Sequence, residues 1–166
     1  PIDDFPPIIS SVEDYEVEPD DVFFCALGDP YWRKHYAEII EKKGGTFVSY
    51  ISSSAMVSPN AKIGEGSYIG SNSVVSDNVK VGKHCMIHGL CTLGHDVQIA
   101  DNVSIEAYCF FGGYSSVGEG SSIHVRSTIL SHKKVGANAS VGAGSVVIRN
   151  VKDGASVFGN PAKKIE

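Results

Sequence analysis

The chain has 166 residues, a formal net charge of −5, and Lys and Arg residues scattered along its length. This length can form one good hydrophobic core, and the acidic balance makes nucleic acid and anionic membranes poor partners. No apolar run approaches the ~20 residues of a membrane-spanning helix, and no signal-peptide pattern opens the sequence. We therefore expect a cytoplasmic protein with no membrane partner.

The first fifty residues predict a strand, a helix and a second strand. Residues 22–27 form an apolar run, which predicts a buried strand. Asp29 is a good N-cap and Pro30 a good first helical residue, so we expect a helix over residues 31–43. Its apolar side is expected to consist of Trp32, Tyr36, Ile39 and Ile40. Residues 46–50 predict the next strand, although one such unit needs more sheet than these residues provide.

From Ile51 to Val147, every sixth residue is Val, Ile, Leu or Phe without exception. Four residues after each of these positions stands a small residue or Val, except at Lys133. A period of six predicts a β-solenoid, in which each repeat is one short flat face followed by a corner. The aliphatic residue points inward and the small residue fills the space near the corner. Three of the cysteines fall in the small-residue column and are interpreted as small buried hydrophobes. They are Cys85, Cys91 and Cys109.

His95 is the sharpest candidate for chemistry on this solenoid. It occupies the corner part of its repeat, so its ring is expected to be accessible, and Asp96 follows it. A carboxylate beside an imidazole can orient the ring and stabilise the imidazolium that it becomes. Acyl transfer from a thioester needs such a base, because the attacking amine or hydroxyl must lose a proton. Periodicity alone leaves a solvated corner histidine as the alternative.

The hexapeptide pattern resembles the left-handed parallel β-helix of the hexapeptide acyltransferases. Residues 87–113 are similar to the catalytic segment of the sialic acid O-acetyltransferase and UDP-amino-sugar N-acetyltransferase family. Residues 157–165, Val-Phe-Gly-Asn-Pro-Ala-Lys-Lys-Ile, match the ending of such enzymes. The resemblance implies a mainly β fold and an acetyl-CoA-dependent enzyme that acetylates an amino or hydroxyl group of a sugar. The expected acceptor is a nucleotide-linked amino sugar or sialic acid, in the biosynthesis of bacterial surface polysaccharide.

The resemblance also implies roles for individual residues. His95 falls on the general base of the family and Asp96 on the adjacent carboxylate. His88 stands where an Asn commonly contacts the substrate, and Ser104 stands where a second histidine is usual. Glu106 is a weaker substrate-binding candidate. Acetyl-CoA is the expected co-substrate, with no metal, and it would lie in a groove between β-helices of a homotrimer. Its expected contacts are Gly113, Gly142, Gly144, Lys163 and Lys164.

Residues 1–50 resemble the C-terminal half of the Rossmann-like domain that precedes the β-helix in bacterial sugar acetyltransferases. Pro1-Ile2-Asp3-Asp4 is similar to a family motif after its second strand, but the Gly-rich nucleotide loop is absent from the sequence. Either the sequence is truncated or the protein has lost that half. We therefore divide the chain into a partial Rossmann-like segment, 1–50, and a β-helix acyltransferase domain, 51–166.

Two other classes of function stay open from the sequence. A γ-class carbonic anhydrase shares the β-helix and binds zinc with three histidines across a subunit boundary. The spacings of His84, His88, His124 and His132 reproduce its ligand pattern poorly. A non-catalytic hexapeptide assembly protein is the third class, and the His95-Asp96 pair argues against it. The sequence assigns no firm role to His124, His132 or Lys133, and it does not name the acceptor.

Overall fold

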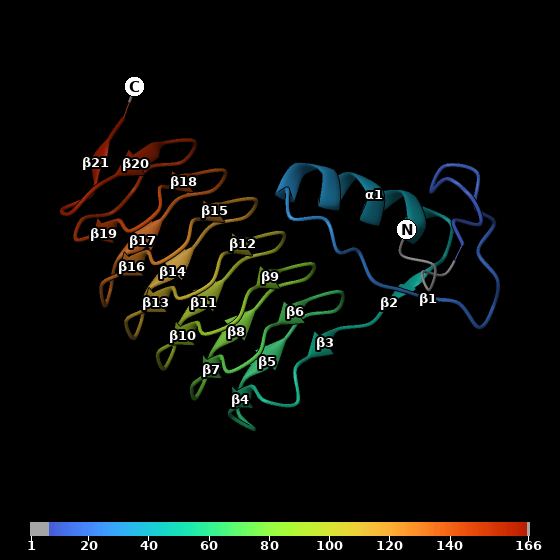
Figure 1. Cartoon of the computed structure of the whole chain (residues 1–166), viewed down its shortest axis with the longest axis horizontal. Helices are drawn as coiled ribbons and strands as arrows, with labels where there is room; N and C mark the ends of the chain where they lie inside the picture. Colours follow the sequence, from blue (N-terminus) through green and yellow to red (C-terminus); the bar gives the residue numbers. More distant parts are fainter. Residues whose placement is uncertain (1–6, 166) are drawn as a thin grey trace.

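The computed structural model describes residues 7–165, and the motif at residues 1–4 lies outside them. The chain from Tyr50 onward winds into a parallel β-solenoid that fits the left-handed β-helix (Figure 1). Leu93 pairs with Phe111, 18 residues later, so three six-residue repeats complete one coil. The predicted mainly β fold with a parallel β-helix is confirmed.

The solenoid has three parallel sheets, which we call sheets I, II and III in the order in which the chain visits them. Sheet I contains β3 (Tyr50–Ile51), β6 (Tyr68–Ile69), β9 (Met86–Ile87), β12 (Ser104–Ile105), β15 (Ser122–Ile123), β18 (Ser140–Val141), β20 (Ser156–Phe158) and the antiparallel β21 (Lys163–Lys164). Sheet II contains β4 (Met56–Val57), β7 (Val74–Val75), β10 (Thr92–Leu93), β13 (Phe110–Phe111), β16 (Thr128–Ile129) and β19 (Val146–Val147). Sheet III contains β5 (Lys62–Ile63), β8 (Lys80–Val81), β11 (Gln98–Ile99), β14 (Ser116–Val117) and β17 (Lys134–Val135).

The core of the solenoid consists of the predicted inward columns. The second residue of each strand points inward, and from Ile69 to Val147 these side chains are buried. The small-residue column is buried beside it, including the three cysteines at Cys85, Cys91 and Cys109. Each inward side chain packs on those of the coils above and below it, so the repeats form one continuous core.

Three corners join the sheets, and we name each by the sheets that it connects. Most corners contain one residue with a positive φ angle, a conformation that Gly and Asn adopt with least strain. Corner III–I follows this preference at Gly66, Asn102, Gly120 and Asn138. Its one exception is His84, whereas corner II–III has Asn78 and then Asp96, Tyr114 and His132 at the corresponding positions. The two corners therefore differ in the side chains that they present.

The N-terminal segment forms less regular structure than the sequence predicts. Strand β1 (Val22–Phe23) pairs in parallel with β2 (Thr46–Phe47), and each has two residues. Helix α1 (Pro30–Lys42) joins them, with the side chain of Asp29 accepting a hydrogen bond from the backbone N–H of Trp32. The predicted cap is therefore confirmed, whereas a Rossmann-like unit is not.

Helix α1 packs against corner III–I through a face that differs from the expected one. Its buried residues are Arg33, Ala37 and Ile40, whereas Trp32 is half exposed. Arg33 is fully buried, and its guanidinium donates to the carbonyl oxygens of His84 and Asn102 on two successive coils. It also donates to Leu27 and Gly28, just before the helix. This one side chain therefore joins the N-terminal segment to the solenoid.

Candidate active site

His95 lies at corner II–III, directly after β10, and its side chain is 59% exposed. Nδ1 of the ring lies 2.9 Å from Oδ2 of Asp96. A carboxylate accepts hydrogen bonds, so this contact keeps the proton on Nδ1 and leaves the lone pair on Nε2. The sequence-predicted pair is thus in contact, with one nitrogen of the ring oriented and the other available as a base.

Gly113 stands one coil above His95 and leaves room for its ring. A β-carbon at position 113 would lie 2.7 Å from Nε2 of His95 and 2.8 Å from Cε1, closer than carbon atoms pack. The small size of Gly113 therefore lets the imidazole lie over the next coil. The sequence assigned Gly113 to the co-substrate, and the structure gives it this additional, local reason.

Two more aromatic rings continue the site along corner II–III. Tyr114 makes an edge-to-face contact with His95, with ring centroids 5.0 Å apart and an interplanar angle of 89°. His132 stacks on the other side of Tyr114 at 5.0 Å and 10°. The sequence left His132 without a role and did not single out Tyr114, because a six-residue count does not show which corner residues meet.

A shallow groove runs from this site along the outward face of sheet III. Beside Asp96 lies a hollow of about 360 Å³ whose lining includes Lys80 and Gln98. The same two residues line the next hollow, of about 630 Å³. That second hollow reaches Asp153, which also lines a third hollow of about 540 Å³ at the C-terminal coils. Adjacent hollows share lining residues, so they form one path from Asp96 to the end of the solenoid.

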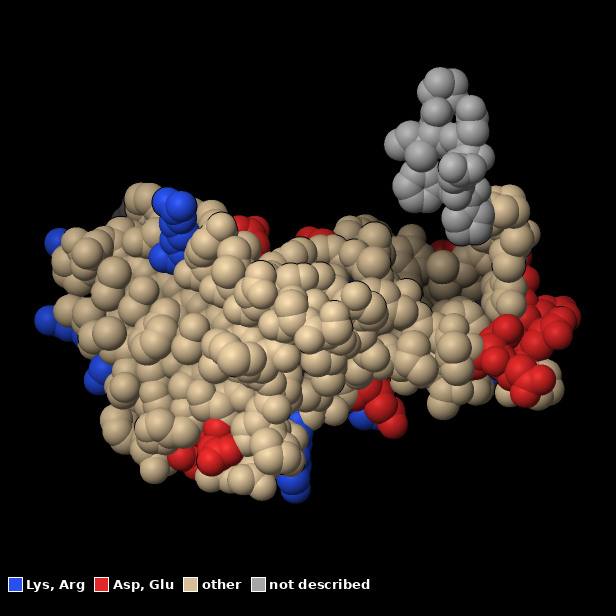
Figure 2. Space-filling model, turned by 60° about the horizontal axis from the view of Figure 1, so that its bottom comes forward, with Lys and Arg blue, Asp and Glu red and all other residues tan. Residues whose placement is uncertain are grey.

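The far end of this path is strongly basic. The third hollow is lined by Arg149, Lys152, Lys163 and Lys164, with Asp153 as its one acidic residue. Figure 2 shows several Lys and Arg side chains at its left end, which in Figure 1 is the end that carries β19 to β21. In a chain of net charge −5, such a concentration favours an anionic ligand. The sequence predicted Lys163 and Lys164 as phosphate contacts but missed Arg149 and Lys152.

The two other glycines assigned to the co-substrate differ in their surroundings. A β-carbon at Gly142 would lie 2.5 Å from Cδ2 of Phe158, so the ring of Phe158 fills the space that this glycine leaves. Gly144 has a φ angle of 67° and no atom within 4 Å of the position of a β-carbon. Only Gly144 of this pair therefore leaves open space beside the backbone.

His88 and Glu106 lie at corner I–II, one coil apart, on the other side of sheet II from His95. Glu106 contacts His124 of the following coil, with Oε1 3.1 Å from Nδ1, and accepts a hydrogen bond from the N–H of Val125. Oγ of Ser140 lies 3.3 Å from Nε2 of His124. Burial raises the pKa of Glu106, but the N–H of Val125 and the two neighbouring histidines outweigh it and lower that pKa below its ordinary value. The corner thus carries a connected polar cluster.

Ser104 lies apart from both groups of residues. It is buried between sheet I and the N-terminal segment, where its hydroxyl donates to the carbonyl of Gly28 at 2.7 Å and accepts from Arg33 at 3.0 Å. Sequence reasoning placed Ser104 beside the substrate because it stands where related sequences have a histidine. Its observed neighbours give it a role in holding the N-terminal segment, and a contact with substrate stays a prediction.

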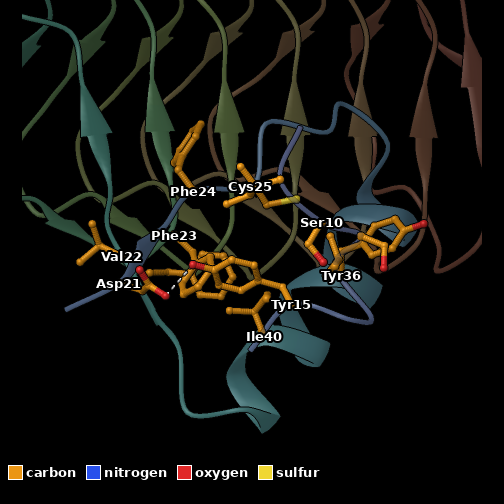
Figure 3. Close-up of a pocket in the computed structure, with 13 residues that line it drawn as sticks. Ser10, Tyr15, Asp21, Val22, Phe23, Phe24, Cys25, Tyr36 and Ile40 are labelled. Atoms are coloured by element: carbon orange, nitrogen blue, oxygen red, sulfur yellow. Dashed lines mark hydrogen bonds between the residues drawn. The ribbon is translucent and has the colours of Figure 1, made fainter. Parts of the chain in front are cut away.

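A separate cavity of about 320 Å³ lies within the N-terminal segment (Figure 3). Its lining is largely aromatic and aliphatic, with Phe23, Phe24 and Tyr36 among the side chains that surround it. The hydroxyl of Tyr15 donates to Asp21 at 2.8 Å, and this bond raises the pKa of Tyr15. None of its lining residues is a histidine, so the base chemistry expected of this chain has no group to perform it there.

Residues 7–165 contain no cluster of three His, Cys, Asp or Glu side chains arranged to hold a metal ion. The histidines at corner I–II flank a single carboxylate, and His95 contacts a different one. Within the same residues no helix has the length and apolar character needed to cross a membrane.

The parallel β-helix and the similar solved structures described below identify the chain as a hexapeptide-repeat sugar acetyltransferase, as the sequence predicted. A family model described as the GMPPB C-terminal domain matches residues 50–160. The chain therefore belongs to that family. No match was found among curated protein sequences.

Solved structures similar to this chain include a perosamine N-acetyltransferase and an acetyltransferase domain. A variant of perosamine N-acetyltransferase from Caulobacter crescentus, in complex with CoA and GDP-perosamine, is 27% identical over 87% of this chain and 69% of that one, with a TM-score of 0.86. The acetyltransferase domain of PglB from Neisseria gonorrhoeae, in complex with acetyl coenzyme A, is 29% identical over 84% of this chain and 68% of that one, with a TM-score of 0.83. WeeI from Acinetobacter baumannii shares the fold at 24% identity, with coverages of 89% and 73% and a TM-score of 0.72.

Proposed function

We propose that this protein is an acetyl-CoA-dependent acetyltransferase that acetylates an amino or hydroxyl group of a sugar. The observation that carries the proposal is the His95–Asp96 contact of 2.9 Å, which leaves Nε2 free at an exposed corner. The similar structures with CoA, acetyl coenzyme A and GDP-perosamine support this function over a carbonic anhydrase-like metalloprotein or an assembly protein.

His95 acts as the general base. As the acceptor nitrogen or oxygen attacks the thioester carbonyl of acetyl-CoA, Nε2 takes the proton that the acceptor loses. Asp96 stabilises the resulting imidazolium through Nδ1. The carbon–sulfur bond then breaks, and the departing CoA sulfur receives the proton back from the imidazolium. The chemistry needs no protein nucleophile, so one base with one orienting carboxylate is sufficient.

Acetyl-CoA binds along the groove on sheet III. Its phosphates are held by the basic hollow of Lys163, Lys164 and Arg149, because these side chains are positive and solvent-exposed. Arg149 stands three coils above His95 in the same corner, about 14 Å away at the usual strand spacing. The pantetheine arm can bridge that distance, so the thioester reaches His95 while the nucleotide part stays at the basic end.

The acceptor is a sugar, and a nucleotide-linked amino sugar fits the GDP-perosamine of the similar structures. His88 and Glu106 contribute to acceptor binding from corner I–II. Glu106 keeps its negative charge because the N–H of Val125 and the neighbouring histidines lower its pKa, so it can accept hydrogen bonds from sugar hydroxyls or an amine.

The active form is a homotrimer with the sites between subunits. The outward side chains of sheet II are mostly apolar, whereas those of sheet III include three lysines. Sheet II presents Met56, Val74, Thr92, Phe110, Thr128 and Val146. An uncharged face of this kind on a small protein favours association with another protein surface. Corner II–III borders this face, so His95 lies at the edge of the proposed interface.

Release of CoA thiol from acetyl-CoA tests the proposal. Purified protein is mixed with acetyl-CoA and a panel of acceptors: GDP- and UDP-linked amino sugars, sialic acid, and the free amino sugars. We expect thiol release that depends on one acceptor class, together with an acetylated product in the mass spectrum. If none of these acceptors causes thiol release, and the protein instead contains bound zinc and hydrates CO₂, the result would support the metalloprotein.

A further inference from the structure

The backbone of corner II–III is strained beside His95, more often than that of corner III–I. The positive-φ residues of corner III–I are Gly or Asn at four of five positions. At corner II–III, Tyr114 has a φ angle of 60° and His132 one of 62°. A β-carbon and a ring in this conformation strain the backbone, as they do at Tyr108 of corner I–II, so the contacts of each ring must decide what that ring does.

Burial in the core does not explain the aromatic residue at position 114. Tyr114 is 53% exposed, and its ring touches the rings of His95 and His132. Within residues 7–165 its hydroxyl makes no hydrogen bond to another side chain or to the backbone. The ring itself is therefore the part of Tyr114 that the structure uses.

The backbone holds this ring in register with His95. The N–H of Tyr114 donates to the carbonyl oxygen of His95 at 3.1 Å, and the N–H of His132 donates to that of Gly113 at 3.1 Å. Successive coils therefore place the three rings one above another. The resulting contacts, perpendicular between His95 and Tyr114 and parallel between Tyr114 and His132, are geometries that aromatic rings prefer.

We propose that Tyr114 is a positioning residue for His95, supported from the next coil by the stacked ring of His132. Asp96 fixes only one atom of the His95 imidazole, Nδ1. The perpendicular contact with Tyr114 restricts the plane of the ring, and the two restraints together fix the direction of Nε2. The inference rests on the proposed function, since it assigns His95 the role of base.

Substitution by Asn separates positioning from a structural role, because Asn tolerates a positive φ angle better than Tyr does. Tyr114→Asn is expected to melt at the same temperature as the wild type or higher. Its kcat for acetyl transfer should fall about tenfold, with the KM for acetyl-CoA unchanged, because misplacing a catalytic group by a fraction of an ångström slows the reaction. Tyr114→Phe keeps the ring and should keep the wild-type rate.

Tyr108→Asn is the matched control. Tyr108 occupies the corresponding position at corner I–II of the same coil, with a φ angle of 63° and the same 53% exposure, but its ring lies under Arg126 and not beside His95. The Tyr108→Asn variant should gain the same relief of backbone strain and keep the wild-type kcat. A fall in kcat of equal size in both variants would overturn the proposal.

The NMR signal of the His95 Cε1 proton gives a readout that does not depend on activity. The ring current of Tyr114 should shift this signal in the wild type, and the shift should be lost in Tyr114→Asn but kept in Tyr108→Asn. If the wild type transfers no acetyl group, the proposed function fails while this signal still decides the contact. An unchanged signal and rate in Tyr114→Asn, or a loss of rate explained by a smaller oligomer in light scattering, would overturn positioning by Tyr114.

Discussion

Two histidines of the same solenoid, His84 and His95, each contact a carboxylate at almost the same distance, yet their surroundings differ. Nε2 of His84 lies 3.0 Å from Glu41, and Nδ1 of His95 lies 2.9 Å from Asp96. Helix α1 covers corner III–I, so His84 is buried against the ring of Phe47. Within residues 7–165 no helix covers corner II–III, and His95 is exposed. Of this pair, only His95 is therefore accessible to a substrate.

Substitution of Arg33 is expected to have the largest effect on stability, and it tests how helix α1 is held on corner III–I. Arg33→Met leaves the carbonyl oxygens of Leu27, Gly28, His84 and Asn102 without their shared donor in a buried place. We expect the free energy of unfolding to fall by about 3 kcal/mol or more, because the cost of leaving buried carbonyl groups unsatisfied adds to the loss of hydrogen bonds from a charged donor.

Urea unfolding followed by circular dichroism measures this loss, and Arg126→Met is the control. Arg126 is exposed and lies 5.5 Å from the centre of the Tyr108 ring, a contact that contributes roughly 1 kcal/mol or less. Equal, small effects in the two variants would mean that Arg33 does not hold the N-terminal segment on the solenoid.

Gly113→Ala tests the open corner with a single methyl group. The added carbon would meet the His95 ring at 2.7 Å, and because this ring is exposed it can swing away without unfolding the coil. We expect kcat to fall about tenfold or more, with little change in melting temperature. If Gly113 instead contacts acetyl-CoA, the Gly113→Ala variant should have a higher KM for acetyl-CoA and an unchanged kcat.

Gly28→Ala serves as the control for this variant. Position 28 has no atom within 4 Å of the β-carbon and no positive φ angle, so the methyl group should change neither kcat nor stability. A Gly113→Ala variant with the kinetic constants of Gly28→Ala would show that the ring of His95 does not need this space.

Substitution of Glu106 is expected to have the smallest effect on stability, and the size of this effect should depend on pH. Its pKa is lower in the folded protein than its ordinary value of 4.5, so its charged form stabilises the fold above that value. This contribution is lost as the pH falls from about 4.5 through the lowered folded pKa. Glu106→Gln should therefore be slightly less stable than wild type at pH 7.

Thermal melts at pH 7 and pH 3 measure this difference between the two proteins, which should shrink at the lower pH. Glu119→Gln is a suitable control, because Glu119 pairs with Lys34 on the surface at the other side of the solenoid. A difference in melting temperature between Glu106→Gln and wild type that grows toward pH 3 would contradict the direction of the pKa shift.

The sequence predicted the periodic part of the molecule well, because an inward column repeats every six residues and leaves no choice of register. Ile99 is buried and Gln98 exposed, as the period requires. The N-cap at Asp29 also follows from local chemistry. The predicted contact between His95 and Asp96 needed only neighbouring residues at a corner, and the structure contains it.

Tertiary contacts between distant segments could not be predicted in this way. The buried face of α1 contains Arg33 instead of Trp32, because backbone carbonyls of the solenoid corners supply acceptors that no helical pattern reveals. The same docking removes Ser104 from the surface. Strand β1 ends at Phe23, although the apolar run continues to Leu27, since only the β2 residues Thr46 and Phe47 pair with it.

We propose that His95 performs the chemistry, whereas His84, with a similar carboxylate contact, performs none. The most direct measurement is the single-turnover rate of acetyl transfer by His95→Asn and His84→Asn, with saturating acetyl-CoA and the acceptor identified by thiol release. We expect His95→Asn to be about 10²–10⁴ times slower than wild type with an unchanged melting temperature. His84→Asn should keep the wild-type rate, because the ring of His84 is buried against Glu41 and Phe47 at the covered corner. A His95→Asn variant within about threefold of the wild-type rate would show that His95 is not the general base.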